Sequence, residues 1–207
     1  MPAKTPSIDS TTEQKILGAA RKVFLTRGMM GARMQEIADE AGINKALLHY
    51  YFRNKEQLFE RTFLEAAGQL FPRIKQLFES DADLFELITH FCDEYIGVLS
   101  QHPHMPLFLF NEINRDPHAF MKKIHTTVGF PDAGLFVKKV QKEIRKGTIK
   151  KVKPHQLLMN MLSMCIFPFV AGPMIRINMQ LDEKQFRQAV EQRKKEVPEF
   201  IFAAIKK

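Results

Sequence analysis

The chain has 207 residues, which suits one or two helical domains with a sizeable core. Apolar residues make up 45% of it and charged residues 26%, a balance that is typical of a soluble globular protein and not of a disordered one. Its two cysteines, Cys92 and Cys165, form no C-x-x-C pair, so neither a disulfide framework nor a structural zinc site is predicted. Buried free thiols suit a reducing cytoplasm, and a cytoplasmic location is expected.

The formal net charge of +8 is unevenly distributed along the chain. Residues 1–60 hold nine Lys/Arg and seven Asp/Glu, a balance of +2. Residues 122–153 hold ten Lys/Arg and two acidic residues, a balance of +8. A basic chain favours a nucleic-acid partner, but most of this excess lies outside the segment that is assigned to DNA below, where it equally fits a solvated face.

The N-terminal segment predicts three helices in quick succession. Apolar residues recur with helical spacing from about Thr11 to Arg27, and Gly28 ends this first helix. Two short helices follow, over about 34–41 and 45–52. Gly42 ends the first of these, and Asn44 is a good N-cap for the second.

The rest of the chain is also helical by its pattern, and no alternating strand pattern stands out. A long helix is predicted from Lys55 towards Phe78, with a kink or break at Pro72. Another covers about 82–100, prolines punctuate shorter helical pieces after it, and the last two helices are expected over 154–175 and 182–205. The apolar run within 157–177 is nearly long enough to span a bilayer, but its Asn and two prolines favour a kinked helix buried in protein, so no membrane partner is predicted.

The segment over 34–58 reads as a helix, a Gly-centred turn and a second helix, which is the sequence form of a helix-turn-helix. A short helix enters the major groove when its outward face is free of core anchors and rich in donors. Leu48 and Phe52 are expected to anchor the third helix, which leaves its other side chains for the groove and the flanking phosphates. Lys55 opens the next helix, so its ammonium and the free backbone N–H groups there suit one phosphate.

This segment resembles the DNA-binding domain of the tetracycline-repressor (TetR) family over about residues 12–63. The family's recurring residues are matched at Ile37, Ala38, Ala41, Gly42, Leu48, Phe52, Lys55 and Leu58. One departure stands out, because the family generally has a Thr or Ser where this chain has Ala32-Arg33 before the second helix. That cap is lost or replaced, at a typical cost of ~1 kcal/mol, and Arg33 becomes a candidate phosphate contact. The candidate DNA-binding residues are Arg33, Asn44, Lys45, Leu47, His49, Tyr50, Tyr51 and Lys55.

The resemblance implies an all-α protein with two domains. An N-terminal three-helix helix-turn-helix domain, expected over 1–60, is joined through a long helix to a helical ligand-binding and dimerisation domain over 61–207. The implied function is sequence-specific transcriptional regulation by a homodimer on double-stranded operator DNA. A small apolar or amphipathic inducer would release it, and the family is mostly repressive. Neither the operator nor the inducer follows from the sequence.

Two sets of C-terminal residues are candidates for these roles, although each residue equally suits ordinary core packing. The first set contains apolar or aromatic side chains and one Asn that would orient a ligand. The pocket candidates are Phe91, Tyr95, Phe108, Asn111, Met121 and Phe167. The second set lies on the apolar stripes of the last two helices, which suit a four-helix interface between subunits. The dimer-interface candidates are Met159, Leu162, Phe186, Val190, Val197, Phe200 and Ile201.

Two other functional classes have less support in the sequence. An enzyme is not predicted, because no nucleophile elbow, phosphate-binding loop or dinucleotide fingerprint occurs. His102 and His104 lie near Pro103 and Pro106 without a metal-ligand pattern, so no catalytic residue, metal or cofactor is expected. The remaining alternative is a helical adaptor or membrane-surface protein that uses the basic residues of 122–153 without operator specificity.

Overall fold

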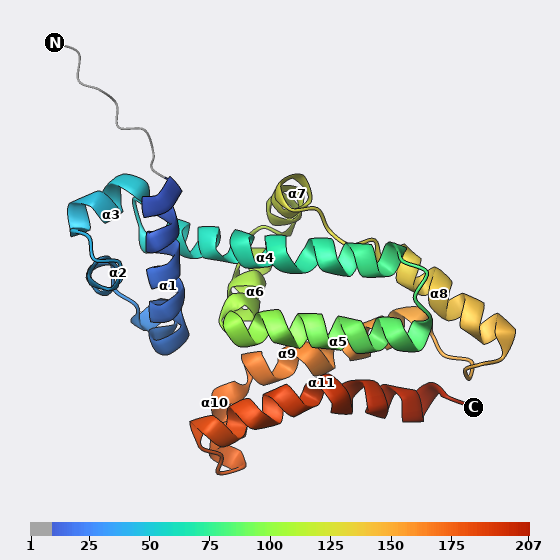
Figure 1. The fold of residues 1–207 in the computed structure, drawn as a ribbon. Coiled ribbons are helices and arrows are strands. Elements are labelled where there is room, and N and C mark those ends of the chain that lie inside the picture. Colours follow the sequence, from blue (N-terminus) through green and yellow to red (C-terminus); the bar gives the residue numbers. More distant parts are fainter. Residues whose placement is uncertain (1–9) are drawn as a thin grey trace. The chain divides into compact units, whose positions relative to one another are not determined.

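The computed structural model describes residues 10–207, and these residues form eleven helices (Figure 1). Within that range the only β-pairing is a single antiparallel bridge between Ile149 and Lys206. The predicted all-α fold is therefore confirmed. The chain divides into two compact units, of which the first ends at Glu65 and the second covers Ala66–Lys207.

The first unit is a small helical domain whose core forms where α1 meets the start of α4. It contains α1 (Ser10–Gly31), α2 (Met34–Glu40), α3 (Lys45–Tyr51) and the beginning of α4 (Lys55–Glu79). Phe24 of α1 and Phe59 of α4 are both buried and pack edge to face, with ring centroids 4.6 Å apart. Gly28 takes φ 66°, which glycine adopts without a steric penalty, so the chain turns there before one more helical turn.

The second unit packs its helices around an aromatic core. After α4 it contains α5 (Leu84–Gln101), α6 (Met105–Arg115), α7 (Pro117–Thr127), α8 (Ala133–Lys146), α9 (Pro154–Val170), α10 (Gly172–Asn178) and α11 (Glu183–Ile205). The helix α5 lies against both α9 and α11. Phe78, Phe91 and Phe136 meet inside, with Phe78 stacked on Phe91 at 6.1 Å and 5.8 Å from Phe136.

Two helix predictions are corrected by the structure. The α4 helix runs unbroken through Pro72, so no break occurs there. The apolar stretch after Pro154 is two helices instead of one, because the chain bends by 74° between α9 and α10. The bend falls at Ala171, directly before Gly172-Pro173 at the start of α10, where proline lacks the N–H that would continue α9. Within residues 10–207 no single helix is long and apolar enough to cross a membrane. Among these residues, only α9 and α10 taken together reach the length and apolar composition of a membrane span, and this pair is bent.

A proline in α9 is compensated by an arginine of α11. Pro168 has no N–H, so the carbonyl of Met164 four residues earlier lacks its helical partner. The guanidinium of Arg193 donates to that oxygen from Nη2 at 2.8 Å and from Nε at 3.3 Å. Because the same contact satisfies a freed carbonyl and joins two helices, it fastens α11 to α9.

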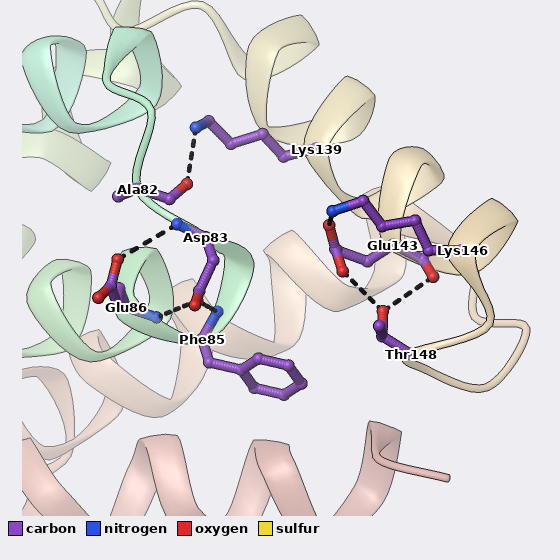
Figure 2. Close-up of polar contacts among 8 residues, drawn as sticks. All are labelled: Ala82, Asp83, Phe85, Glu86, Lys139, Glu143, Lys146 and Thr148. Carbon is purple, nitrogen blue, oxygen red and sulfur yellow. Dashed lines mark hydrogen bonds and ion pairs between the residues drawn. The ribbon is translucent and has the colours of Figure 1, made fainter.

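Polar contacts fasten α8 near its middle and at its C-terminal end (Figure 2). Near the middle of α8, the Lys139 ammonium donates to the backbone oxygens of Ser80 and Ala82 in the turn between α4 and α5. At the end of α8, the Glu143 carboxylate accepts from Lys146 Nζ at 2.7 Å and from Thr148 Oγ1 at 2.6 Å. The hydrogen bonds from Lys146 and Thr148 hold the pKa of Glu143 below its ordinary value.

Glu143→Gln is expected to lower the free energy of unfolding by about 0.5–1 kcal/mol at neutral pH, because the charged partner of Lys146 is lost. A carboxyl whose pKa is lower in the folded state contributes stability above its unfolded pKa and loses it as the pH falls through the folded value. The difference between the two proteins should therefore shrink in acid. Urea unfolding of both proteins at neutral and acid pH measures it, and a difference independent of pH would contradict the assignment.

Candidate nucleic-acid interface

The third helix is held in place by one cap and two buried anchors. The Asn44 side-chain oxygen accepts a hydrogen bond from the Leu47 backbone N–H at 2.7 Å, which fixes the start of α3. Leu48 is fully buried at 0% exposure, and Phe52 directly after the helix is also buried. The prediction that these two side chains anchor the helix inward is confirmed. Their burial turns the opposite side of α3 outward.

The outward side of α3 presents a mixed polar and apolar surface. Lys45 and His49 are exposed, as are Leu47 at 37% and Tyr50 at 52%. Tyr51 is half-buried, and its ring packs edge to face against that of Tyr50 at 5.6 Å. These groups are of the kinds that read base edges and methyl groups in the major groove.

His49 is oriented by the backbone that follows the helix. Its Nδ1 lies 3.1 Å from the carbonyl oxygen of Arg53. Because a carbonyl only accepts, this contact assigns the proton of the neutral ring to Nδ1 and leaves Nε2 as an acceptor. An exposed acceptor at this position suits the exocyclic amino group of adenine or cytosine.

Lys55 has a structural role that the sequence did not suggest. Its ammonium donates to the carbonyl oxygens of Ala32 at 3.2 Å and of Met30 at 3.4 Å, in the connection between α1 and α2. Direct phosphate binding by Lys55 stays a prediction, and the structure adds these two carbonyl contacts to it. The side chain therefore positions the start of α2 instead of extending freely from the surface.

Arg33 is the N-cap residue of α2 but provides no side-chain cap. Instead its backbone N–H donates to the Glu36 carboxylate at 3.2 Å. Its guanidinium is exposed and makes no ion pair within residues 10–207. The side chains of Arg27 and Arg53 are also exposed and make no ion pair within residues 10–207, and neither residue is among the candidates predicted from the sequence to bind DNA. Exposed cations next to a helix-turn-helix are the residues that neutralise phosphates.

Comparison with known proteins identifies the N-terminal segment of the chain. The model for bacterial regulatory proteins of the tetR family matches residues 16–62. Residues 16–62 therefore form a segment of the tetR-family type. The matched residues cover α2, α3 and the parts of α1 and α4 that form the core of the first unit.

Curated relatives of the TetR family resemble the N-terminal half of this chain. The HTH-type transcriptional repressor KstR2 of Mycolicibacterium smegmatis is 30% identical over 89 residues, 43% of each chain. The HTH-type transcriptional repressor NicS of Pseudomonas putida is 32% identical over 108 residues, 49% of this chain and 48% of the relative. The chain therefore matches less than half the length of these curated relatives.

Solved structures share the fold over nearly the whole chain. The ketosteroid transcriptional regulator KstR2 of Mycobacterium tuberculosis has a TM-score of 0.64 at 16% identity and covers 97% of both chains. The transcriptional regulator FadR of Bacillus subtilis, solved with stearoyl-CoA, has a TM-score of 0.60 at 18% identity, over 91% of this chain and 96% of that one. At these identities the likeness shows that this chain shares the fold of these regulators through the second unit.

The six pocket candidates do not gather around one cavity in the structure. Phe91 and Tyr95 stack on each other at 5.1 Å inside the aromatic core, and burial raises the pKa of the Tyr95 hydroxyl well above its ordinary value. Phe108 is buried and packs against Phe120 at 6.5 Å, while Met121 is half-buried. Asn111 and Phe167 are instead exposed, so the structure corrects their assignment to an inward-facing pocket.

The dimer-interface candidates divide into buried and exposed side chains. Val190, Val197 and Ile201 are buried in the chain's own core, where α11 packs on α5, and their assignment to a partner is corrected. Leu162 and Phe186 are half-buried. Met159 at 50% and Phe200 at 68% exposure remain available for a second subunit.

Asn44→Ala is expected to destabilise the first unit by about 1 kcal/mol, because the Leu47 N–H loses its side-chain acceptor. Asn44→Ser is the matched control, since serine also caps helices and should recover most of the loss. Urea unfolding followed by circular dichroism measures both variants. Equal stability of the alanine and serine variants would show that the cap contributes nothing.

Proposed function

We propose that this protein is a sequence-specific DNA-binding transcriptional regulator that inserts α3 into the major groove of an operator. The observation that carries the proposal is the arrangement of α3, in which Leu48 is fully buried while Lys45, His49 and Tyr50 face outward. Donors and aromatic groups on an exposed short helix suit base edges and phosphates. Curated relatives include the repressors KstR2 and NicS and the activator FasR, so the sign of regulation is left open.

Selection from a random duplex library, followed by fluorescence anisotropy on the enriched sequence, tests operator recognition. We expect binding that survives excess nonspecific DNA, because specific complexes are typically 10³–10⁷-fold tighter than nonspecific ones. His49→Ala should weaken specific binding and relax the preference at one base position, at a cost of about 1–3 kcal/mol. A chain that enriches no sequence, and whose binding disappears with competitor, would instead fit a helical adaptor or membrane-surface protein.

We further propose that the active form is a homodimer joined through the exposed apolar sides of α9 and α11. Met159 and Phe167 of α9 and Phe200 of α11 are large apolar side chains that are at least half exposed. Between these helices lies a groove of about 320 Å³ whose lining is mostly apolar, with Leu157, Met164 and Ile201 among its walls. A second subunit would cover these side chains and remove them from water.

The inducer that we propose is a small apolar or amphipathic molecule bound in the second unit. The support is chemical, since the interior around Phe78, Phe91 and Phe136 is aromatic and the half-buried phenol of Tyr95 stacks on Phe91. A solved neighbour of the same fold, FadR of Bacillus subtilis, holds stearoyl-CoA. Thermal-shift measurements with long-chain acyl compounds and steroids test this proposal, because a ligand that binds only the folded state raises its melting temperature. A bound compound that leaves operator affinity unchanged would not be the inducer.

A further inference from the structure

Six cationic side chains gather where the loop after α8 meets the end of α11. The backbone brings the two segments together, because Ile149 pairs with Lys206 and the Lys150 N–H donates to the Ile205 carbonyl at 2.8 Å (Figure 1). We define the basic face as Arg145, Lys150, Lys151, Lys153, Lys206 and Lys207, all of which are exposed. Two stretches that are distant in sequence therefore place their charges on one surface of the second unit.

The basic face has no acidic partners of its own. The sequence contains no Asp or Glu between Glu143 and Asp182, and none from residue 200 to 207. The Lys150 ammonium donates to the Ala204 carbonyl at 3.3 Å, and that of Lys206 lies 5.0 Å from the Phe85 ring. These neutral partners hold the side chains in place without cancelling their charge.

The neighbouring lysines of α8 belong to a different environment. Lys139, Lys142 and Lys146 line a small cavity of about 130 Å³ together with Asp81, Asp83 and Glu143, so the charges there balance. In the same region Lys146 is paired with Glu143 at 2.7 Å. In this part of the second unit, the uncompensated charge therefore lies on the basic face.

The composition of the basic face indicates the kind of partner that it fits. None of the described large apolar side chains that are exposed lies in residues 142–153 or 201–207. The nearest one, Phe200, lines together with Lys153 the groove between α9 and α11 that the proposed second subunit would cover. A membrane-surface site needs apolar side chains that enter the acyl boundary in addition to positive charge. Lysine and arginine without such anchors match the phosphates of a nucleic acid, where duplex DNA carries one negative charge per roughly 1.7 Å.

We propose that the basic face is a second contact surface for duplex DNA, which binds the phosphate backbone without regard to sequence. This surface is separate from α3, and the proposal does not depend on operator reading by α3. Its ammonium and guanidinium groups would replace counterions condensed on the duplex, so binding there should weaken steeply with salt. Such a surface would raise the local concentration of the protein on DNA and speed its encounter with an operator.

The test uses the full chain with operator reading by α3 disabled by Lys45→Ala and Tyr50→Ala. Arg27, Arg33 and Arg53 remain in this background, so the part of the residual binding that the basic face contributes is measured by substitutions within that face. Binding to a labelled duplex of random sequence is followed by anisotropy at several salt concentrations. In this background, Arg145→Glu with Lys151→Glu and Lys207→Glu should weaken binding about tenfold or more and reduce the slope of log affinity against log salt by about 2–3. The matched control is Lys75→Glu with Lys184→Glu and Lys195→Glu, which changes the net charge equally at exposed positions elsewhere in the second unit.

The proposal is supported when the control triple binds within about twofold of the α3-disabled parent while the basic-face triple does not. It is overturned when both triples lose the same affinity, since net charge alone then explains the effect. It is also overturned when the α3-disabled chain binds no duplex, or binds vesicles of anionic phospholipid in preference to duplex. Circular dichroism checks the fold, and the Arg145→Gln, Lys151→Gln, Lys207→Gln triple provides a second reading if the glutamates unfold the protein.

Discussion

Leu48→Ala is expected to lower the free energy of unfolding by about 2–5 kcal/mol and to abolish specific DNA binding. Leu48 is fully buried, so removing its side chain leaves a cavity between α3 and the rest of the first unit. A short helix of seven residues has little stability of its own and depends on this packing. Urea unfolding and anisotropy on the selected operator measure the two effects.

The neighbouring leucine provides the control for this prediction. Leu47 is 37% exposed on the outward side of α3, so Leu47→Ala should change stability by no more than about 0.5 kcal/mol. It should still weaken operator binding, because an exposed apolar side chain at this position suits the methyl group of thymine. If the two alanine variants lose the same stability, the orientation of α3 described above is wrong.

The helix α3 was predicted well from the sequence, because the residues that define its start and its buried side are close together in the chain. A glycine turn, an N-cap at Asn44 and anchors four residues apart at Leu48 and Phe52 define which side of α3 is buried. The role of Lys55 was missed for the opposite reason. Its carbonyl partners lie 23 and 25 residues away in the sequence, and no local pattern reports a contact of that kind.

The packing of the second unit was harder to predict. Helical periodicity shows that the apolar side of a helix is buried, but it does not show which other segment covers that side. Val190, Val197 and Ile201 form such a stripe, yet α5 of the same chain covers them, and no partner is needed. The bend between α9 and α10 was missed within an apolar run. Its indicator was the adjacent Gly172-Pro173 pair, since these two residues together favour a break.

The exposed side of α11 allows a prediction about dimerisation. Phe200→Asp is expected to convert the proposed homodimer into a monomer at concentrations where the wild type is dimeric. Phe200 is 68% exposed in the single chain, so the fold should tolerate the change. In a twofold-symmetric dimer each substitution occurs twice. Losing the burial of two Phe side chains, at about 1.5–3 kcal/mol each, raises the dimer dissociation constant about 10²- to 10⁴-fold.

Operator binding should fall together with dimerisation, because a regulator of this kind holds two half-sites one helical turn apart and a monomer engages only one. Phe110→Asp is the matched control, since Phe110 is an exposed phenylalanine on α6, outside the proposed interface. It should leave both the molecular mass in solution and the operator affinity close to those of the wild type. Light scattering after size exclusion and anisotropy on the operator separate the outcomes. A Phe200→Asp protein that stays dimeric places the subunit contact away from this side of α11, whereas one that is monomeric yet keeps full operator affinity shows that DNA binding does not require the dimer.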